Sequence, residues 1–489
     1  MLWSHDPRSG ERRGEPIAAT TTAELDAVVH GAHAARAAWA DATTAERADV
    51  LDAIAAALET AGADLVAVAD AETALGKVRL RGEVARTTGQ LRMFGDVLRE
   101  GDYVAAMLSP ANETRPDVRR MLHPIGPVAV FAASNFPFAF SVAGGDTASA
   151  LAAGCPVVVK AHEGHPRTSA LTARIVAAAA KVAGAPDGTF GIVYGVERGR
   201  DLVLNPGIRA VGFTGSTAGG RALFDLASGR PDPIPFFGEL GSINPVVVLP
   251  GAAAARADQI ANGFAGSLTL GGGQFCTNPG LVFVPAGDER LLTAIATAVA
   301  ASSGGPMLTE KIHAGFERMT AASEWAHLPL IAEGSGDGPW AARPEVRRVP
   351  IAQFGTGPLT EERFGPAALL VTYDDVAALP AVLARLPGSL TASVHASDDE
   401  LDAARPIAAA LHEIAGRLIM NDWPTGVAVC WAMHHGGPWP ASTSAARSSV
   451  GATAIERWLT PVAYQDWPDV LLPPALQDGN PLGINRVER

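Results

Sequence analysis

One cysteine of this 489-residue chain, Cys276, stands where a thiol could do nucleophilic chemistry. It follows the glycines Gly271 to Gly273 and precedes the turn signal Pro279-Gly280. Glycine is tolerated where the backbone passes close to another group, and a thiol held there can meet a ligand while its own amide stays free. Judged by residue type alone, a buried structural cysteine is favoured, because free cysteine is among the most buried residues. The neighbouring residues must decide between the two interpretations.

Four polar residues next to predicted strand ends would suit a covalent mechanism. Glu239 could act as a base, Asn135 could donate an amide hydrogen bond, and Lys160 and Ser216 could contact a cofactor. Each also has a simpler interpretation: Asn135 could shape the turn before Phe136-Pro137, and Glu239 could be an ordinary cap. Taken singly, each residue fits the simpler interpretation at least as well.

Several familiar signatures are absent from the sequence. The stretch Gly215 to Gly220 follows a predicted strand but does not match the dinucleotide fingerprint G-x-G-x-x-G. His412-Glu413 lacks the second histidine of H-E-x-x-H, and neither His162 with His165 nor His434-His435 has a third ligand at metal-site spacing. No serine stands in G-x-S-x-G, which disfavours an α/β-hydrolase. No metal site is therefore predicted.

Alternating strands and helices must position these candidates. From Thr20 to about Leu98, apolar residues recur at three- and four-residue steps, which predicts helices, with N-cap candidates at Thr20 to Thr22. Further along, short uncharged strands alternate with helices, which predicts parallel sheets covered on both faces. The predicted strands are 127–133, 156–160, 191–195, 208–213, 245–249, 281–285, 390–395 and 417–420. Ligands bind at the carboxyl ends of such strands, which directs attention to Asn135, Lys160 and Ser216.

Two segments depart from this alternation. Residues Gly101 to Arg120 mix glycine and proline with short apolar pieces and could form a hairpin or an arm. Residues Trp467 to Arg489 are rich in proline and polar residues, which predicts an extended tail.

Composition and charge narrow the function classes. The formal net charge of −13 disfavours nucleic acid or an anionic membrane as the main partner. The three cysteines are far apart, imply no disulfide framework and fit a reducing cytosol. No start typical of a signal peptide and no uncharged stretch near the roughly 18 residues of a membrane span is visible. A cytoplasmic protein without a membrane or nucleic-acid partner is expected.

Five motifs occur in the order found in the aldehyde dehydrogenase superfamily and span nearly the whole chain. They are 134–141 (SNFPFAFS), 212–216 (GFTGS), 237–241 (FGELG), 273–276 (GQFC) and 361–366 (EERFGP). The chain therefore resembles that superfamily. Residues 233–241, 275–280 and 433–438 are also similar to the branch containing alpha-ketoglutaric semialdehyde (2,5-dioxopentanoate) dehydrogenases, and a group of bacterial NADP-linked fatty aldehyde dehydrogenases is similar too.

The resemblance implies an α/β fold with a Rossmann-like cofactor domain, an α/β catalytic domain and a small β oligomerisation arm. On this basis residues 1–100 and 125–240 are expected to form the cofactor-binding domain and residues 241–448 the catalytic domain. Residues 101–124 and 449–489 are expected to form the arm and tail of a homodimer or homotetramer.

The resemblance also implies oxidation of an aldehyde to a carboxylic acid, with NAD or NADP, through a thiohemiacetal and a thioester on Cys276. The Asn135 amide and the Cys276 backbone N–H would hold the oxyanion, and such a donor stabilises a transition state by about 3 kcal/mol. Glu239 would activate the water that hydrolyses the thioester. The implied substrate is alpha-ketoglutaric semialdehyde, with 2-oxoglutarate as the product.

For the cofactor, the family pattern implies that Lys160 and Glu362 contact the two riboses. It places Gly215 and Ser216 near the pyrophosphate and Phe364 against the nicotinamide end.

Glu163 departs from the pattern of NADP-preferring relatives. A carboxylate there can accept hydrogen bonds from the adenosine ribose hydroxyls, but it would repel a 2′-phosphate. Arg167 and Arg200 could offset this repulsion if they point inward. NAD is therefore expected to be used at least as well as NADP.

Three residues are candidates for contact with the substrate. Phe138 and Phe275 flank the catalytic candidates and could line the substrate path, although aromatic residues at such places are more often plain core. Arg92 could bind the carboxylate of an acidic semialdehyde, although most such arginines are solvated or ion-paired on the surface. Cys276 is expected to show a lowered thiol pKa or cofactor-dependent alkylation that Cys155 and Cys430 do not show.

Other functions stay open at this stage. The chain could be an NADP-linked dehydrogenase of fatty or other aldehydes, an enzyme that transfers the acyl group to coenzyme A, or a non-catalytic interaction protein. A base at Glu239 favours hydrolysis over transfer to coenzyme A.

Overall fold

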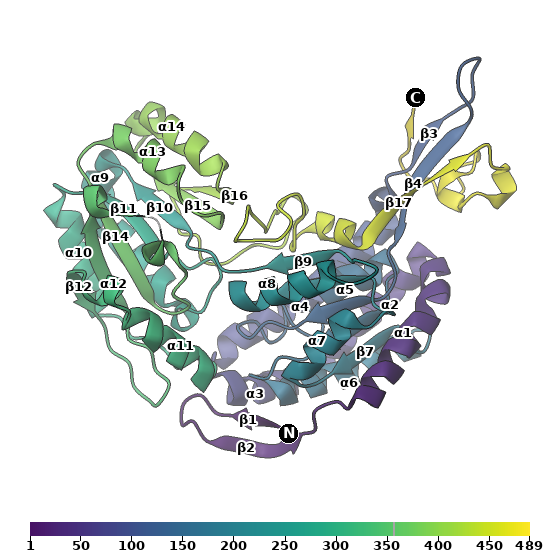
Figure 1. Ribbon diagram of the computed structural model, residues 1–489, viewed down its shortest axis with the longest axis horizontal. Helices are drawn as coiled ribbons and strands as arrows, with labels where there is room; N and C mark the ends of the chain where they lie inside the picture. The colour runs from purple at the N-terminus through teal and green to yellow at the C-terminus, as the bar shows by residue number, and fades with distance from the viewer. Residues whose placement is uncertain (356) are drawn as a thin grey trace.

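Two β-sheets, each covered by helices, form the bulk of the molecule in the computed structural model, which describes residues 1–355 and 357–489. The sheets lie on opposite sides of the molecule, and a narrow β arm projects beside the smaller one (Figure 1). The chain begins with a hairpin of β1 (Leu2–His5) and β2 (Arg12–Ile17). The predicted α/β class is confirmed.

The first sheet has five parallel strands. In spatial order they are β7 (Phe190–Val193), β6 (Val157–Lys160), β5 (Val128–Phe131), β8 (Ala210–Thr214) and β9 (Phe236–Glu239). The predicted strands at 127–133, 156–160, 191–195 and 208–213 are confirmed to within a few residues. The sequence analysis missed β9, because its four residues include a glycine and a glutamate.

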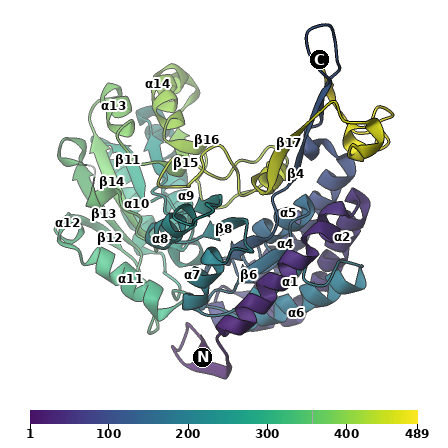
Figure 2. The same ribbon diagram turned by 45° about the vertical axis from the view of Figure 1, so that its right-hand side comes forward.

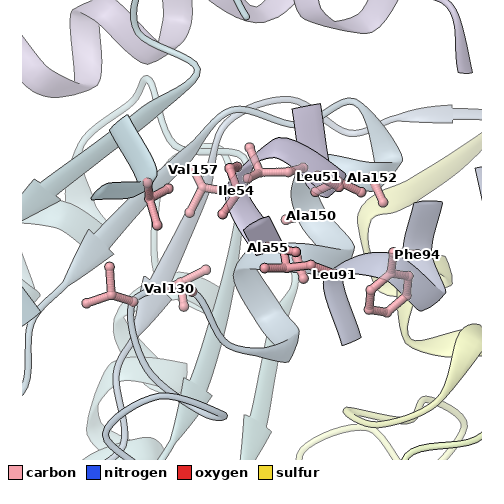
Figure 3. Close-up of a cluster of buried hydrophobic side chains, with 14 of the residues drawn as sticks. Leu51, Ile54, Ala55, Leu91, Phe94, Val130, Ala150, Ala152 and Val157 are labelled. Atoms are coloured by element: carbon pink, nitrogen blue, oxygen red, sulfur yellow. The ribbon is translucent and has the colours of Figure 1, made fainter. Parts of the chain in front are cut away.

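Apolar residues alternate between the two faces of this sheet. Along β5, Val128 and Val130 face one hydrophobic core, whereas Ala129 and Phe131 face another. Both faces are therefore buried, which explains why these strands read as continuous apolar runs. Figure 3 shows part of the first core, to which Leu51, Leu91 and Val130 all belong.

Helices cover both faces. The first core is closed by α2 (Thr44–Thr60), α3 (Gly62–Thr73), α4 (Lys77–Glu100), α5 (Gly145–Ala153) and α6 (Pro166–Val182). The second is closed by α1 (Thr22–Asp41), α7 (Val196–Leu204) and α8 (Thr217–Ser228).

Capping boxes define where the first two helices begin. The Thr21 hydroxyl accepts a hydrogen bond from the Glu24 N–H, and the Glu24 carboxylate accepts one from the Thr21 N–H. Thr43 and Glu46 repeat the arrangement at α2. Each box satisfies N–H groups that the helix itself cannot. The predicted N-cap is thus confirmed at Thr21.

The second sheet has seven strands. In spatial order they are β12 (Leu330–Glu333), β13 (Glu345–Pro350), β14 (Ala367–Tyr373), β11 (Leu281–Pro285), β10 (Pro245–Val248), β15 (Ser389–His395) and β16 (Ala415–Met420). Among the described residues of this sheet, only the pairing of β12 with β13 is antiparallel. The four predicted strands in this region are confirmed, whereas β12, β13 and β14 were missed.

Helices also cover this sheet on both sides. One face carries α9 (Pro250–Thr269) and α10 (Glu289–Ala300). The other carries α11 (Glu310–Thr320), α12 (Ser323–Ala326), α13 (Leu379–Leu383) and α14 (Leu401–His412). None of the helices in the described residues is long and apolar enough to cross a membrane.

The arm is a four-stranded sheet in the order β17 (Leu459–Gln465), β4 (Val118–Pro124), β3 (Met107–Ser109), β18 (Val487–Glu488). The hairpin expected between Gly101 and Arg120 is formed by β3 and β4. Figures 1 and 2 both show the arm projecting away from the helices, with the C-terminus beside it.

The extended tail predicted for residues 467–489 is wrong in part. Leu472, Leu476 and Ile484 are buried against Val104 and Leu108, so the tail folds back onto the arm. These few apolar residues are spaced irregularly among prolines, which is why no periodic pattern predicted that they are buried. The predicted domain boundaries stay a prediction.

Candidate active site

The candidate residues gather where the two sheets face each other. Asn135 and Ser216 follow β5 and β8, and Glu239 is the last residue of β9, at the carboxyl ends of the five-stranded sheet. Cys276 and Glu362 instead precede β11 and β14, at the amino ends of strands in the seven-stranded sheet. The carboxyl-end rule therefore points to only one side of the site.

The cysteine loop is held by close backbone contact. Gly271 and Gly273 have φ angles of 60° and 71°, a conformation that glycine adopts without strain. A Cβ atom on Gly273 would lie 2.3 Å from the carbonyl carbon of Gly365 and from the nitrogen of Pro366. The close approach expected for these glycines is confirmed, and it joins the loop of Cys276 to the loop of Glu362.

Two donors lie beside the cysteine. The Asn135 side-chain amide is buried and donates a hydrogen bond of 2.8 Å to the Gln274 carbonyl. The Cys276 carbonyl accepts one of 2.8 Å from the Asn244 side chain. The Cys276 N–H donates no hydrogen bond to any residue that the structure describes. A backbone N–H and a side-chain amide are thus available near one thiol, as an oxyanion site requires.

Burial dominates the chemistry of the thiol. It raises the pKa of Cys276 to about 12, and the nearby carboxyls of Glu362 and Glu239 act in the same direction. Arg86 and Arg417 oppose them and lower it. The expectation of a lowered thiol pKa is wrong for the protein without cofactor, because a thiolate is poorly solvated in this position.

A histidine contacts the thiol. The Nε2 atom of His435 lies 3.7 Å from the Cys276 Sγ. Burial lowers the pKa of this imidazole to about 3, and Arg417 and Arg86 add to the effect. The ring is therefore neutral near pH 7 and a weak base, and it can hydrogen-bond with the sulfur. The sequence analysis considered His435 only as a metal ligand; the signal was its place in the motif 433–438.

Glu239 is enclosed beside the cysteine. Its side chain is 7% exposed, and its Oε2 atom has no hydrogen-bond partner among the described residues. Burial raises its pKa well above the usual range, Arg457 opposes this, and Asp146 adds to it. Arg457 is itself held by Asp146 at 2.7 Å. The unpartnered carboxyl oxygen is suited to hold a water or a proton.

Glu362 lies against the end of β9. A Cβ atom on Gly241 would lie 2.8 Å from its Oε2 atom and 2.6 Å from the Thr217 hydroxyl, so only glycine fits there. Burial raises the pKa of Glu362 to about 8. Its neighbour Arg363 anchors the loop by hydrogen bonds to the Glu361 and Pro358 carbonyls. Phe364, next in the chain, is partly buried.

The edge of the five-stranded sheet fits a dinucleotide. Gly215 and Ser216 are exposed at the N-terminus of α8, where free N–H groups and the helix dipole favour phosphate. Lys160, at the end of β6, is buried and forms an ion pair with Glu163. A carboxylate and an ammonium group at this edge suit the hydroxyls of a ribose.

Glu163 also lines a hollow of about 630 Å³ together with Thr20, Thr22 and Arg198. Arg198 donates a hydrogen bond to Thr22 and pairs with Asp201. The two arginines that were expected to offset the charge of Glu163 do not line this hollow: Arg167 packs against Gly14, and Arg200 is exposed. Arg198 was missed because it stands in no motif.

Of the three substrate candidates, the structure brings only Phe275 to the site. Its ring lies 5.3 Å from that of Phe136, edge to face. The structure contradicts the prediction for Phe138. This residue is 2% exposed and packs into the first hydrophobic core, between the five-stranded sheet and its helices. Because Phe136 and Phe138 are two residues apart on one loop, sequence spacing could not tell which of them turns inward.

The structure also contradicts the predicted contact of Arg92 with the substrate. It forms a bidentate ion pair with Glu59 of α2, and both side chains are more than 40% exposed. The arginines that α4 does turn toward the site are Arg79 and Arg86. Arg79 lies 4.7 Å from the ring of Phe275, and the charge of Arg86 acts on the Cys276 thiol.

Comparisons of the sequence with protein families and with individual proteins agree with one another. A family model described as "Aldehyde dehydrogenase family" matches residues 3–327. Alpha-ketoglutaric semialdehyde dehydrogenase 2 of Azospirillum brasilense is 46% identical to the chain, covering 99% of this chain and 95% of that protein. Alpha-ketoglutaric semialdehyde dehydrogenase of Acinetobacter baylyi is 43% identical, covering 96% and 91%.

Solved structures agree on the fold. The 1-pyrroline-5-carboxylate dehydrogenase from Thermus with bound NAD has a TM-score of 0.81 and 23% identity, covering 95% of this chain and 90% of that one. At this identity the likeness shows the fold alone.

The raised thiol pKa predicts the order of alkylation by iodoacetamide. Without cofactor, the exposed Cys430 should react before Cys276, and the rate at Cys276 should rise with pH from 7 to 9.5, because the thiolate is the reactive form. His435→Asn should slow Cys276 by about tenfold, since it removes the ring nitrogen that lies 3.7 Å from the sulfur and can donate a hydrogen bond to the thiolate. Peptide mass mapping over time measures both rates.

His434→Asn, at the adjacent position, is the matched control and should leave both cysteines at their wild-type rates. Faster reaction at Cys276 than at Cys430 in the protein without cofactor would contradict the effect of burial described above.

Proposed function

The chain belongs to the aldehyde dehydrogenase family, and from this premise we propose that it oxidises alpha-ketoglutaric semialdehyde to 2-oxoglutarate with NAD or NADP. The observation that carries the proposal is the 46% identity, over 99% of the chain, to a protein named for that reaction. The cluster of Cys276, Asn135 and Glu239 supports it. The resemblance inferred from the five motifs is confirmed at the level of the family.

We propose that Cys276 is the nucleophile. Its sulfur bonds to the aldehyde carbon, the carbonyl double bond opens to leave a negative charge on the oxygen, and the thiol proton passes to water. His435, whose Nε2 atom lies 3.7 Å from the sulfur, is placed to hydrogen-bond with it. The Asn135 amide and the Cys276 N–H hold the oxyanion, and each such donor can contribute about 3 kcal/mol. A neutral amide suits this role, because it stabilises the developing charge without trapping the thiolate.

NAD or NADP, when bound, supplies the hydride acceptor. Its proposed ligands are Lys160, Glu163, Gly215, Ser216 and Glu362, with Phe364 toward the nicotinamide. The exposed N-terminus of α8 and the Lys160–Glu163 pair support this assignment. Because Glu163 would repel a 2′-phosphate, we propose that NAD is used at least as well as NADP.

We propose that Glu239 releases the product. The thioester on Cys276 is attacked by water, Glu239 takes a proton from that water, and the carbon–sulfur bond breaks to give the acid and the free thiol. The unpartnered Oε2 atom and the raised pKa of Glu239 support this role, because a higher pKa makes the carboxylate a stronger base.

The arm supports a proposal about assembly. Strand β17 is the edge strand of the arm sheet, and large apolar residues stay exposed near it, including Val462 (39%), Trp467 (51%) and Leu471 (61%). Open edges and exposed apolar groups together are typical of a surface that pairs with another chain. We propose that the arm joins subunits of a homodimer or homotetramer.

Initial rates with a panel of aldehydes test the proposed function. Alpha-ketoglutaric semialdehyde should give a kcat/KM at least tenfold above those of pentanal and decanal, with NAD at least as effective as NADP. The measurement is formation of reduced cofactor. A preference for decanal with NADP would support a fatty aldehyde dehydrogenase instead, and turnover that depends on coenzyme A would indicate acyl transfer.

Glu239→Gln tests the hydrolytic step. Steady turnover should fall by 10²- to 10⁴-fold, about the contribution of a general base. One equivalent of reduced cofactor should still form in a burst, leaving an acyl group on Cys276 that intact-mass measurement detects. In the wild type, turnover should rise with pH through a midpoint above the usual carboxyl range, because the raised pKa keeps Glu239 protonated in acid. Wild-type turnover in the variant would exclude Glu239 as the base.

Light scattering at micromolar concentration tests the assembly. The wild type should have two or four times the mass of one chain. Val462→Arg should shift it toward the monomer, because it puts a charge on the exposed apolar face of β17. Val182→Arg is the control. Val182 is an exposed residue of α6, which is not part of the arm, so this substitution should leave the mass unchanged. A monomeric wild type would refute the proposal.

A further inference from the structure

One arginine beside the site, Arg86, forms no ion pair within the residues that the structure describes. The Arg86 guanidinium lies on α4 and packs over the rings of Phe136 and Phe140, with its Cζ atom 5.7 and 5.2 Å from their centres. Its Nε and Nη2 atoms are buried without a hydrogen-bond partner among the residues that the structure describes. A cation withdrawn from water without a partner is unfavourable, so this arrangement suits a group that arrives with a ligand.

A second arginine on the same face of the helix is only partly satisfied. Arg79 donates a hydrogen bond of 2.7 Å to the Asn135 carbonyl, whereas its Nη1 atom is buried without a partner in the described chain. Arg79 and Arg86 are seven residues apart, two helical turns, so both project from one side of α4. Together they place two positive charges on that side.

One carboxyl, Glu83, lies between the two arginines. It accepts hydrogen bonds from the backbone N–H groups of Phe138 (2.8 Å) and Ala139 (3.1 Å), and its Oε2 atom is buried without a hydrogen-bond partner among the described residues. Burial lowers the pKa of both guanidinium groups, and the charge of Glu83 acts on each of them in the opposite direction. Two guanidinium groups against one carboxyl leave an excess of positive charge on this side of the helix.

Aromatic side chains and His435 lie between the two arginines and the Cys276 thiol. The ring of Phe140 lies 6.2 Å from that of His435, whose Nε2 atom lies 3.7 Å from Cys276 Sγ. On the other side, Phe136 packs against Phe275, the residue before the cysteine. The charges of Arg86 and Cys276 act on each other, and Arg86 is only partly buried.

We propose that Arg86, assisted by Arg79, binds the carboxylate of the substrate while its aldehyde carbon meets Cys276. This inference rests on the proposed function and names the residues that make it selective for an acidic semialdehyde. A guanidinium binds a carboxylate through two parallel hydrogen bonds. The flanking phenylalanines hold the guanidinium by cation–π contact without neutralising it, and they exclude water that would weaken the pair.

Arg86→Gln is the direct test. The kcat/KM for alpha-ketoglutaric semialdehyde should fall at least 100-fold, mostly through KM, whereas the kcat/KM for pentanal should change less than threefold. Arg86→Lys, which keeps the charge but loses the planar fork, should fall between. Arg81→Gln, an exposed arginine on the same helix, is the matched control and should resemble the wild type. The pentanal rate also shows that each variant is folded.

Binding of 2-oxoglutarate provides a readout that needs no turnover. Calorimetry should show at least tenfold weaker binding to Arg86→Gln than to the wild type or to Arg81→Gln. A wild type that prefers the acidic semialdehyde together with an Arg86→Gln variant that keeps this preference would overturn the assignment of Arg86 but not the proposed function. A wild type that prefers uncharged aldehydes would overturn the proposed function, and the role of Arg86 with it.

Discussion

Close contact between two backbone segments holds the candidate site together. Gly273 passes so near the Gly365-Pro366 peptide that no side chain fits between them. This contact joins the loop of the cysteine to the loop of Glu362, although nearly ninety residues separate them in the chain. The thiol, the proposed oxyanion donors and the proposed cofactor ligand consequently keep fixed relative positions, which a covalent mechanism requires.

Burial away from water determines the pKa values of the acidic groups in the site. Cys276, Glu239 and Glu362 all have raised pKa values, because burial penalises a negative charge, and the charges of Glu362 and Glu239 add to the effect at the thiol. Arg86 and Arg417 counteract only part of this effect on the thiol. Neutral side chains in such a site can ionise one at a time, when a substrate or cofactor supplies a compensating charge.

The sequence predicted most of the strands well, because parallel strands buried on both faces leave apolar runs that are easy to recognise. The carboxyl-end rule led to Asn135, Lys160 and Ser216 for a physical reason, namely that parallel strands finish at one edge. It did not apply to Cys276 and Glu362, which precede their strands, and there only the family motifs pointed to function. Short or glycine-containing strands such as β9 carried too little pattern to be recognised.

The sequence by itself determined the α/β class and the family, and it supplied the proposed cysteine, base and amide, since these depend on local pattern and on motifs. The tertiary structure alone decided which side chains turn inward: Phe136 and not Phe138, Arg86 and not Arg92, and His435 at the thiol. It also reversed the expected pKa shift of Cys276. The reason is that side-chain direction and burial follow from packing between distant segments, which spacing along one segment cannot specify.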